Sequence, residues 1–522
     1  MLPVIIVGAG PTGLALALAL AGHDVPSVVL DGSDGPPAPR PARSLVLAPD
    51  VARWSTLPGA HRESATWSAW RTVHRGREVE HHAFGPEDAP RHLPQHVLEA
   101  TLREAVTRHE LVRLIRGHRL TDFEQRDGDL LAHSVFRPTD GRREENRQWR
   151  GGYLVGCDGA RSTVRKLLGV PFPGRTGVER YAVAALRTEL PWPGEAGLHR
   201  GLSVGEVTVR PLTGGRWRLD WPLPPDEGLV TPEALLRRVA GTLTDWHDGE
   251  PPPYELLDTG VHICHQRLAR SWRVDRVFLA GDAAHLLGAL GTQQVTEGLR
   301  DAQNLAWKLA VASHLGATES LLDSYQTERR GAVGGRLRAV DQALPLVRGR
   351  GGLAGRLPGR GRSRAALLGD GHLGRGALGG PPEYVTGPLG TAATAAATTR
   401  VGARVTDVAV TALDGSRARL RDRLGGPLLL VLTAPGARVW DARHWLSAGL
   451  MPELAAVAET LGLPAELLVT EEYPGAGAHT VLLVRPDGHL AACLPGAHTE
   501  LLREAVRHLR GVDRPAEPAG ER

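Results

Sequence analysis

The 522-residue sequence contains very little cysteine, and its few cysteines are far apart. Cys157, Cys264 and Cys493 form no Cys-x-x-Cys pair, so the sequence supports neither a metal site nor a disulfide framework. This usage fits a reducing, cytoplasmic compartment. Long apolar runs are missing too, since the apolar segment 2–21 is interrupted by glycines and has no basic leader. We therefore expect neither a membrane span nor a signal peptide.

Lysine is almost absent, because Lys166 and Lys308 are the only two and the remaining basic residues are arginines. The net charge is only +4, and no compact block of basic residues is interleaved with aromatic ones. Nucleic-acid binding is therefore not expected. With 42% hydrophobic and 23% charged residues the composition is that of a soluble globular protein, and the length predicts two to four domains.

The N-terminal segment has the pattern of a dinucleotide-binding βαβ unit. Residues 3–7 predict a strand, 8–13 read Gly-Ala-Gly-Pro-Thr-Gly, 14–21 predict a helix, and 26–30 predict a second strand followed by Asp31. In such a unit the glycines allow a tight turn, backbone approach to a pyrophosphate and close helix packing, while the terminal acid binds ribose hydroxyls. A glycine turn without a ligand is the simpler alternative. The predicted binding residues are Gly8, Gly10, Pro11, Thr12, Gly13 and Asp31.

A strand–loop–helix pattern recurs near the middle of the chain. Residues 276–280 are a short apolar run, a loop with Gly288 and Gly291 follows, and apolar residues recur at helical spacing from Val295 to about residue 314. Asp282 follows the predicted strand, where its carboxylate can accept hydrogen bonds from ligand hydroxyls. The loop N–H groups and the helix N-terminus favour a ligand with negative charge. An ordinary connection with an acidic cap is the alternative.

Two segments carry a family resemblance. Gly-Asp-Ala-Ala-His at 281–285 and the ten residues 301–310 resemble the second flavin-binding motif of the FAD-dependent aromatic hydroxylases, the group A flavoprotein monooxygenases. Residues 152–165 resemble that family's Asp-Gly motif, which is associated with both FAD and NAD(P)H. The three motifs occur in the family's order. The resemblance, closest to the phenol-hydroxylase and aromatic polyketide hydroxylase branch, implies non-covalent FAD, NADPH as co-substrate and no metal.

The resemblance also implies roles for single residues. Asp282 would hold the ribityl chain of FAD, and Gln95 would contact its ribityl–phosphate region. Arg43 would lie beside the flavin and the nicotinamide, although a solvated loop arginine is an equal alternative. Ser162 is expected to cap the helix after the Asp-Gly motif. Beyond the N-terminal unit, the expected cofactor-binding residues are Arg43, Gln95, Asp158, Gly159, Asp282, Gly291, Thr292, Gln293, Gln294 and Val295.

The loop before the central helix departs from the family pattern. The family's loop reads His-x-x-Pro-Pro-x-Gly-Gly-Gln-Gly-x-Asn, whereas residues 285–296 lack both prolines, two of the glycines and the asparagine. The resemblance places Gly288, Ala289 and Leu290 near the reactive edge of the flavin. The departure therefore bears on the outcome of oxygenation rather than on FAD binding, and no side-chain base is assigned.

Residues 175–255 are expected to form a sheet that covers the substrate. Strands are predicted at 182–190, 201–209 and 216–221, followed by a helix at 232–243. Its tryptophans either form flat walls for an aromatic substrate or belong to the core, and the core is the commoner role. His262 is either a general base or a satisfied core histidine. The tryptophans are Trp192, Trp217, Trp221 and Trp246.

The C-terminal residues are expected to form a small α/β domain that resembles the thioredoxin-like domain of the phenol-hydroxylase branch. It lacks a cysteine pair, so a redox role is not expected. The Gly- and Arg-rich stretch 348–380 is predicted as weak helices or a mobile stretch, and the Thr- and Ala-rich stretch 385–400 as a linker. The expected class is α/β, divided into a Rossmann-like FAD-binding domain (1–174 and 261–347), an inserted β-sheet substrate domain (175–260), a connecting segment (348–400) and the thioredoxin-like domain (401–522).

Three classes of function remain at this point. In the first, NADPH reduces FAD, the reduced flavin traps O2 as a C4a-hydroperoxide, and one oxygen atom enters an aromatic substrate, with a polyketide-type polycyclic phenol as the expected class. A Baeyer–Villiger insertion on a related skeleton belongs to the same class. The second is an FAD-dependent reductase or dehydrogenase without oxygen insertion, and the third is a flavin-binding protein without catalysis. A monomer or a homodimer is expected.

Overall fold

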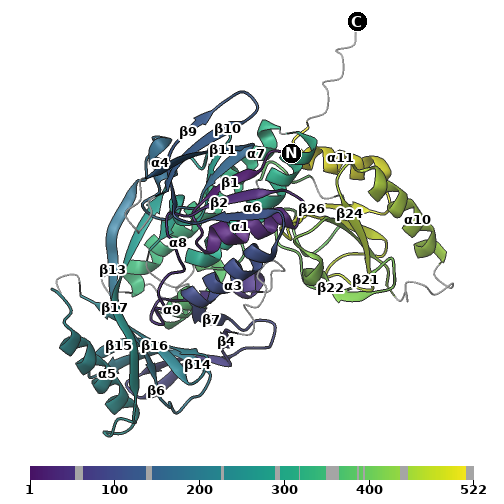
Figure 1. Ribbon diagram of the computed structural model, residues 1–522. Coiled ribbons are helices and arrows are strands. Elements are labelled where there is room, and N and C mark those ends of the chain that lie inside the picture. The colour runs from purple at the N-terminus through teal and green to yellow at the C-terminus, as the bar shows by residue number, and fades with distance from the viewer. Residues whose placement is uncertain are drawn as a thin grey trace, which may run out of the picture.

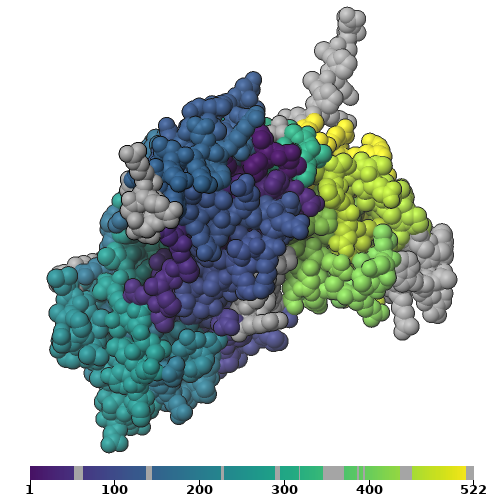
Figure 2. Space-filling view, in the orientation of Figure 1, coloured from purple at the N-terminus to yellow at the C-terminus, as the bar shows by residue number. Residues whose placement is uncertain are grey.

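A computed structural model describes most of the chain (Figure 1). The described residues are 1–52, 63–136, 144–224, 228–288, 294–316, 318–347, 364–384, 387–391, 394–435 and 445–512, without the side chains of 345–347, 364–368 and 445–448. Figure 2 shows the C-terminal residues, in yellow and green, at one end of the molecule and the teal residues of the large sheet at the other. Within the described residues, no helix is long and apolar enough to cross a membrane.

A six-stranded sheet forms the centre of the molecule. Its strands in spatial order are β18 (Arg273–Val274), β19 (Val277–Leu279), β12 (Tyr153–Gly156), β1 (Val4–Val7), β2 (Ser27–Leu30) and β8 (Val112–Ile115). All neighbours pair in parallel except β18 with β19. The carboxyl ends of β1, β2, β12 and β19 therefore meet at one edge, where ligands bind in open α/β sheets. This arrangement confirms the α/β class and the predicted first βαβ unit.

Helices cover one face of this sheet. α1 (Pro11–Ala21) packs against α3 (Gln95–Arg108) and against α6 (Gln294–Leu315). α1 begins with a proline at its first turn and contains only apolar and small residues, so all of it from Gly13 onward is buried. The opposite face meets a three-stranded antiparallel sheet of β9 (His118–Gln125), β10 (Leu130–Phe136) and β11 (Glu145–Gly151).

An eight-stranded sheet extends from the centre and carries the substrate-side surface. Its strands in spatial order are β20 (His285–Leu287), β17 (Glu255–Leu268), β13 (Gly174–Arg187), β16 (Arg216–Leu223), β15 (Gly205–Leu212), β14 (Glu195–Leu202), β5 (Ala69–His74) and β6 (Arg77–Ala83). The single strand predicted at 201–209 is wrong, because β14 turns at Ser203 and Val204 and returns as β15. The sheet also includes β5, β6 and β20, which lie outside 175–260.

The tryptophans of this region lie in the core. α5 (Pro232–Trp246) covers one face of the large sheet, and Trp217 and Trp221 are buried between them. Trp192 and Trp246 pack against the same core and against each other, with ring centroids 5.4 Å apart. Alternation along the strands turns Arg218 and Asp220 of β16 to the other face together with Arg210 of β15, so this face is polar around β15 and β16, whereas Val183 and Ala185 of β13 form a small apolar cluster there. The commoner role of these tryptophans, as core, is therefore the correct one.

The helices after the central helix hold a buried ionic network. α7 (Glu319–Tyr325) continues through a π-helical turn (Gln326–Arg330) into α8 (Gly331–Val347). Arg329, in the turn, donates to Asp301 (2.8 Å) and Glu297 (2.7 Å) on α6, and all three side chains are at most 1% exposed. α9 (Arg364–Leu373) then lies beside β5, so the stretch 348–400 includes a helix that packs on the large sheet.

The C-terminal residues form a second α/β unit. Its six strands in spatial order are β22 (Arg417–Arg419), β21 (Ala409–Ala412), β24 (Ala465–Thr470), β23 (Leu428–Thr433), β25 (Thr480–Val484) and β26 (Leu490–Pro495). α10 (Trp445–Thr460) and α11 (Thr499–Leu509) pack on this sheet. The predicted buried strand, hairpin and closing helix are confirmed. Trp307 and Val311 of α6 belong to the same hydrophobic cluster, so the C-terminal unit packs directly on the central helix.

Candidate cofactor and substrate cavity

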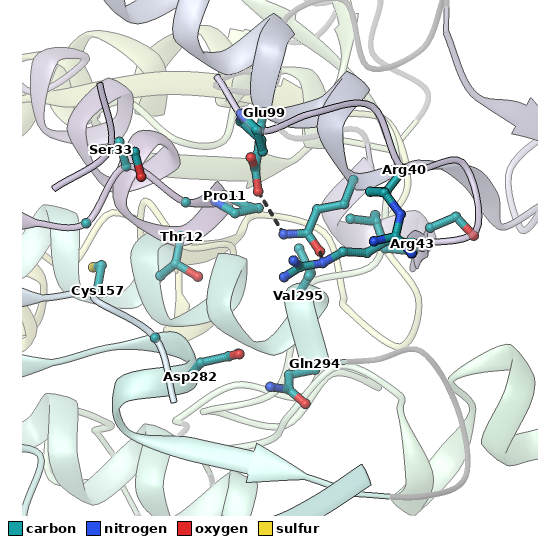
Figure 3. Close-up of a pocket in the computed structure, with 18 of the residues that line it drawn as sticks. Pro11, Thr12, Ser33, Arg40, Arg43, Glu99, Cys157, Asp282, Gln294 and Val295 are labelled. Carbon is teal, nitrogen blue, oxygen red and sulfur yellow. Dashed lines mark hydrogen bonds between the residues drawn. The ribbon is translucent and has the colours of Figure 1, made fainter. Parts of the chain in front are cut away.

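One cavity of about 950 Å³ joins the carboxyl edge of the central sheet to the polar face of the large sheet. One end of the cavity is lined by the three segments that contain Gly8, Asp158 and Asp282. The other end is lined by residues of β13, β15, β16 and β17. Figure 3 shows Arg43 and Glu99 on one side of it and Asp282 and Gln294 on the other. The structure thus brings together segments as far apart in the chain as Val7 and His372.

The first glycines fit a backbone cradle. Gly8 has φ +106°, a conformation that side chains rarely adopt, and a Cβ there would lie 2.5 Å from the Cys157 oxygen. A Cβ on Gly13 would lie 2.1 Å from the Gly8 oxygen, so only glycine lets α1 approach β1 this closely. At Gly10 a Cβ would meet no protein atom within 4 Å, and the residue lines the cavity. The space beside Gly10 is therefore open to a ligand in the cavity.

Asp31 has a partner that sequence reasoning missed. Its Oδ1 accepts from the Ser33 N–H (2.9 Å), and its Oδ2 accepts from Arg103 Nη2 (3.1 Å). The same Nη2 donates to the Ala9 oxygen (2.9 Å), whereas Nε and Nη1 of Arg103 are buried without a hydrogen-bond partner among the described residues. A buried cation with unused donors beside the first turn suits an anionic ligand.

The Asp-Gly segment, residues 158 and 159, forms another part of the cavity wall. Asp158 Oδ2 accepts from the N–H groups of Thr163 (2.6 Å) and Val164 (3.1 Å), which begin α4 (Thr163–Leu167). Ser162 caps that helix, as predicted, by accepting from Arg165 N (3.0 Å). The other Asp158 oxygen, Oδ1, is buried and has no partner among the described residues. Asp158 and Gly159 both line the cavity, so this carboxylate retains hydrogen-bonding capacity there.

Asp282 follows the end of β19 and lies close to Gln294, the first residue of α6. Burial raises the pKa of its carboxyl group. A hydrogen bond with Gln294 opposes this rise, and the nearby charges of His285 and Arg43 oppose it to a smaller extent. The turn that contains Asp282 is held by Asp301 of α6. The Gly281 N–H donates to Asp301 Oδ2 (2.9 Å), and His285 Nε2 contacts the same oxygen (2.8 Å). Asp282, Gln294 and Val295 line the cavity at the N-terminus of a 22-residue helix.

Arg43 and Gln95 act as a pair. Arg43 Nε donates to Gln95 Oε1 (3.0 Å), and Gln95 Nε2 donates to Glu99 Oε1 (2.7 Å) on the same helix. All three line the cavity. Arg40 ties the same loop to the large sheet, since its Nε donates to both Asp258 carboxylate oxygens at 3.0 Å. Arg43 thus lies at the cavity wall with one hydrogen bond to Gln95, and its side chain remains exposed to solvent.

Comparison with known proteins agrees with this geometry. Residues 1–339, more than half of the chain, match the family described as FAD binding domain. The chain belongs to this FAD-binding family. A relative, the 3-(3-hydroxy-phenyl)propionate/3-hydroxycinnamic acid hydroxylase of Comamonas testosteroni, is 31% identical over 341 residues, which is 63% of this chain and 55% of the relative. The matched part thus spans about half the length of this curated relative.

Solved structures show the same fold over almost the whole chain. The flavin-dependent monooxygenase PieE, in complex with FAD and substrate, matches with a TM-score of 0.77 and 23% identity, covering 98% of this chain and 99% of PieE. Aklavinone-11 hydroxylase, in complex with FAD and aklavinone, matches with a TM-score of 0.74 and 24% identity over the same shares. The Rossmann-like FAD-binding architecture with additional domains is therefore established for this member of the FAD-binding family.

The residues present fit FAD. Gly10 leaves backbone space, Arg103 has unused donors, and Asp158 has an unused acceptor, all around one cavity. These are the groups that a pyrophosphate and hydroxyl-bearing ligand needs. Gly288 also lines the cavity, with φ +77°. The predicted residues Ala289, Leu290, Gly291, Thr292 and Gln293 lie outside the described residues.

The large sheet contributes a polar cluster that the sequence did not reveal. Arg210, Arg218 and Asp220 are at most 7% exposed and line the cavity of this FAD-binding protein. Arg210 Nη2 donates to His372 Nδ1 (3.1 Å), which α9 brings from the stretch 348–400. His262 lines the cavity, and desolvation there, followed by the charge of Arg218, lowers the pKa of its imidazole. Within the described part of the chain, no group of three or more His, Cys, Asp or Glu side chains is arranged to hold a metal ion.

Proposed function

We propose that this member of the FAD-binding family is a cytoplasmic, NADPH-consuming monooxygenase that inserts one oxygen atom from O2 into an aromatic substrate. A polycyclic, phenol-type substrate of the polyketide kind is the class that we favour. The observation that carries the proposal is the single cavity shared by the FAD-type cradle and the polar face of the large sheet. A binding site for a cofactor and a sheltered chamber for a second molecule are both needed for oxygen transfer.

Each lining segment has a proposed task. Gly8, Gly10 and Gly13 admit the pyrophosphate of FAD, while Asp31 and Arg103 hold the adenosine side. Asp158 and Asp282 accept hydrogen bonds from the hydroxyls of the cofactor. The N-terminus of α6 favours negative charge near the flavin by up to ~2 kcal/mol where it is partly buried. These tasks use every acidic residue for which the sequence motifs predicted a role. The other proposed contacts are made by Pro11, Thr12, Gln95, Gly159, Gln294 and Val295.

The reaction divides between cofactor and protein. Bound FAD would accept hydride from NADPH and activate O2, whereas the protein positions the reactants and excludes water. Arg43 lies at the cavity wall, held by Gln95, where a visiting NADPH would meet a positive charge. Residues of β13, β15, β16 and β17 line the far side of the cavity and shelter the reaction from water.

Two alternatives use the same cavity. A Baeyer–Villiger insertion differs in the substrate atom that receives the oxygen, and a reductase or dehydrogenase omits oxygen transfer. The names of the relatives favour oxygen transfer, since the Comamonas testosteroni relative and aklavinone-11 hydroxylase are both hydroxylases. The C-terminal unit, which we interpret as thioredoxin-like, has the single buried thiol of Cys493 and is proposed to be structural.

The proposal is tested by cofactor content and isotope transfer. The purified protein is expected to bind FAD that denaturation releases intact, which shows that the bond is non-covalent. With NADPH and candidate polycyclic phenols, products are then analysed by mass after turnover under labelled O2, and hydrogen peroxide is measured in parallel. One labelled oxygen atom per product is the expected result. Substrate oxidised at an equal rate without air would assign the protein to the reductase–dehydrogenase class.

A further inference from the structure

Two arginines face each other across the sheet that lines the cavity. Arg210 on β15 and Arg218 on β16 are directly opposite in the antiparallel register. Their side chains are 3% and 7% exposed. Like charges directly opposite each other destabilise a sheet, and burial strengthens that repulsion because the surroundings screen less than water. The pair therefore needs compensation by negative charge.

The described residues supply only half of that compensation. Asp220 accepts from Arg218 Nη2 (2.6 Å) at Oδ1 and from Arg210 Nη1 (2.5 Å) at Oδ2. Asp220 is the main group that raises the pKa of Arg210 against burial, and the two arginines together lower the pKa of Asp220 to about 2. Two fixed positive charges and one fixed negative charge leave a net charge of +1 in the buried triad.

Two histidines beside the triad, His372 and His92, do not change this balance. Burial, followed by the charge of Arg210, lowers the pKa of His372 to about 3, and the same causes lower that of His92 to about 3. In the neutral ring of His92, Nδ1 donates to the Pro211 oxygen (2.8 Å), which leaves Nε2 to accept from Ser44 Oγ (2.7 Å). Both imidazoles are therefore uncharged at neutral pH, and neither adds or removes charge.

One guanidinium also keeps an unused donor. Nε of Arg210 is buried without a hydrogen-bond partner among the described residues, although its Nη1 and Nη2 are both engaged. A second neighbour, Tyr181, also lines the cavity, and its hydroxyl donates to Glu179 Oε2 (2.6 Å). The wall around Arg210 thus combines an uncompensated positive charge with an open cavity on one side. Such a wall favours an anionic ligand in the cavity.

We propose that the Arg210–Arg218–Asp220 triad binds an oxyanion of the aromatic substrate, either a carboxylate or an ionised hydroxyl of an acidic phenol or hydroxyquinone. The inference rests on the proposed function for the identity of the cavity as a substrate site. It adds that the substrate is anionic when it binds, and that Arg210 sets this preference. Hydrogen bonds between charged partners are shorter and about twice as strong as neutral ones, so the neutral analogue of a ligand is rejected.

The test measures binding rather than turnover. Four bicyclic probes are titrated into the FAD-containing protein at pH 7 by calorimetry: 2-naphthoate, its methyl ester, 2-hydroxy-1,4-naphthoquinone, which is ionised at this pH, and its 2-methoxy ether. At least one anion is expected to bind about tenfold or more tightly than its neutral partner. The acid pair and the quinone pair distinguish a carboxylate from an ionised hydroxyl. Equal affinities within both pairs would overturn the proposal.

Variants then assign the preference to the triad. Arg210→Gln lowers the net charge of the triad to zero and is expected to reduce the anion preference to less than about twofold. Asp220→Asn raises it to +2 and is expected to increase the preference, whereas Arg210→Lys keeps the charge and most of the preference. Arg216→Gln, on the same sheet but outside the cavity lining, is the matched control and should bind like the wild type. A preference that survives in Arg210→Gln would refute the role of this arginine.

The design separates this inference from the proposed function. Flavin absorbance of each purified sample shows whether FAD is bound, and far-ultraviolet circular dichroism shows whether the variant is folded. Where Arg210→Gln fails to fold, the comparison of Asp220→Asn with Arg210→Lys still reports the effect of charge. A wild type without FAD contradicts the proposed function alone. A wild type with FAD and no charge preference contradicts this inference alone.

Discussion

The substitution Gly10→Ala is expected to weaken FAD binding without lowering the folding stability of the protein. Gly10 precedes α1 with φ −78° and ψ 179°, an extended conformation that alanine adopts without strain. A Cβ there would meet no protein atom within 4 Å. Gly10→Ala is therefore expected to leave the stability of the FAD-free protein unchanged or to raise it by about 0.4–1 kcal/mol, since alanine reduces the freedom of the unfolded chain.

The same methyl group is expected to weaken FAD binding. If the pyrophosphate passes over Gly10, the added carbon occupies its place, and overpacking by one methyl group costs about 1–3 kcal/mol. That range corresponds to a roughly 5- to 150-fold rise in the Kd for FAD. The Kd is measured by titrating FAD into the FAD-free protein and following the quenching of flavin fluorescence.

Gly13→Ala provides the contrast. Its Cβ would lie 2.1 Å from the Gly8 oxygen and 3.2 Å from Cys157 Cβ, so the contact is within the protein itself. The FAD-free Gly13→Ala protein is expected to lose about 1–3 kcal/mol or more of folding free energy. Gly85→Ala, at an exposed position with no atom within 4 Å of the new Cβ, should match the wild type in both measurements. Unchanged FAD affinity in Gly10→Ala would refute the position that we assign to the pyrophosphate.

Three further outcomes follow from the same contacts. Arg103→Gln removes the charge beside Asp31 and should raise the Kd for FAD by roughly 10- to 150-fold, since hydrogen bonds to charged groups contribute about 1.5–3 kcal/mol; an unchanged Kd would exclude Arg103 from the site. Cys493→Ser, in the C-terminal unit, should leave NADPH-dependent turnover per folded protein unchanged, and a large loss of turnover without loss of folding would contradict its structural role. His92 and His372 have folded pKa values of about 3, below the ordinary 6.5, so the unfolded chain binds more protons between these values and stability should fall as the pH falls from about 6.5, by up to ~1.4 kcal/mol per pH unit for each histidine. Because His23 and His199, with folded pKa values of about 4, also contribute to the slope, His372→Asn should lower it by up to ~1.4 kcal/mol per pH unit in urea unfolding between pH 6 and 5, and an unaltered slope would show that His372 does not contribute.

Local pattern was sufficient to predict the cofactor end of the cavity. The strand before Gly8, the helix after it and the strand before Asp31 are all short, apolar and uninterrupted, so sequence periodicity and glycine spacing indicated them directly. The helix capped by Ser162 and the long helix from Gln294 were predicted for similar reasons. In each case the determinants lie within about twenty residues of one another.

The substrate end depends on pairing between distant segments. Arg218 and Asp220 share one face of β16, but Arg210 joins them only through the register of β15 with β16, and each charge alone resembles a surface charge. His372 lies in a Gly- and Arg-rich stretch whose composition favours disorder, yet it stacks on Trp70 at 5.3 Å and contacts Arg210. Arg103 is one of many arginines on helical surfaces. Its burial against Ala9 follows from how α3 packs on α1, which periodicity alone does not specify.

The buried salt bridges that link α6 to the C-terminal unit through Glu328, in the turn after α7, make the chain a poor candidate for modular engineering. Glu328 accepts from Lys308 (2.7 Å) on α6 and from both terminal nitrogens of Arg485 (2.7 and 2.8 Å) in the C-terminal unit, all almost fully buried. A truncation near residue 400 would leave Glu328 without Arg485 and expose the apolar face around Trp307. Removing one partner of a buried ion pair costs about 3–5 kcal/mol, much of the stability of a typical domain. Chimeras that exchange C-terminal units between relatives would therefore need to transfer both sides of this junction together.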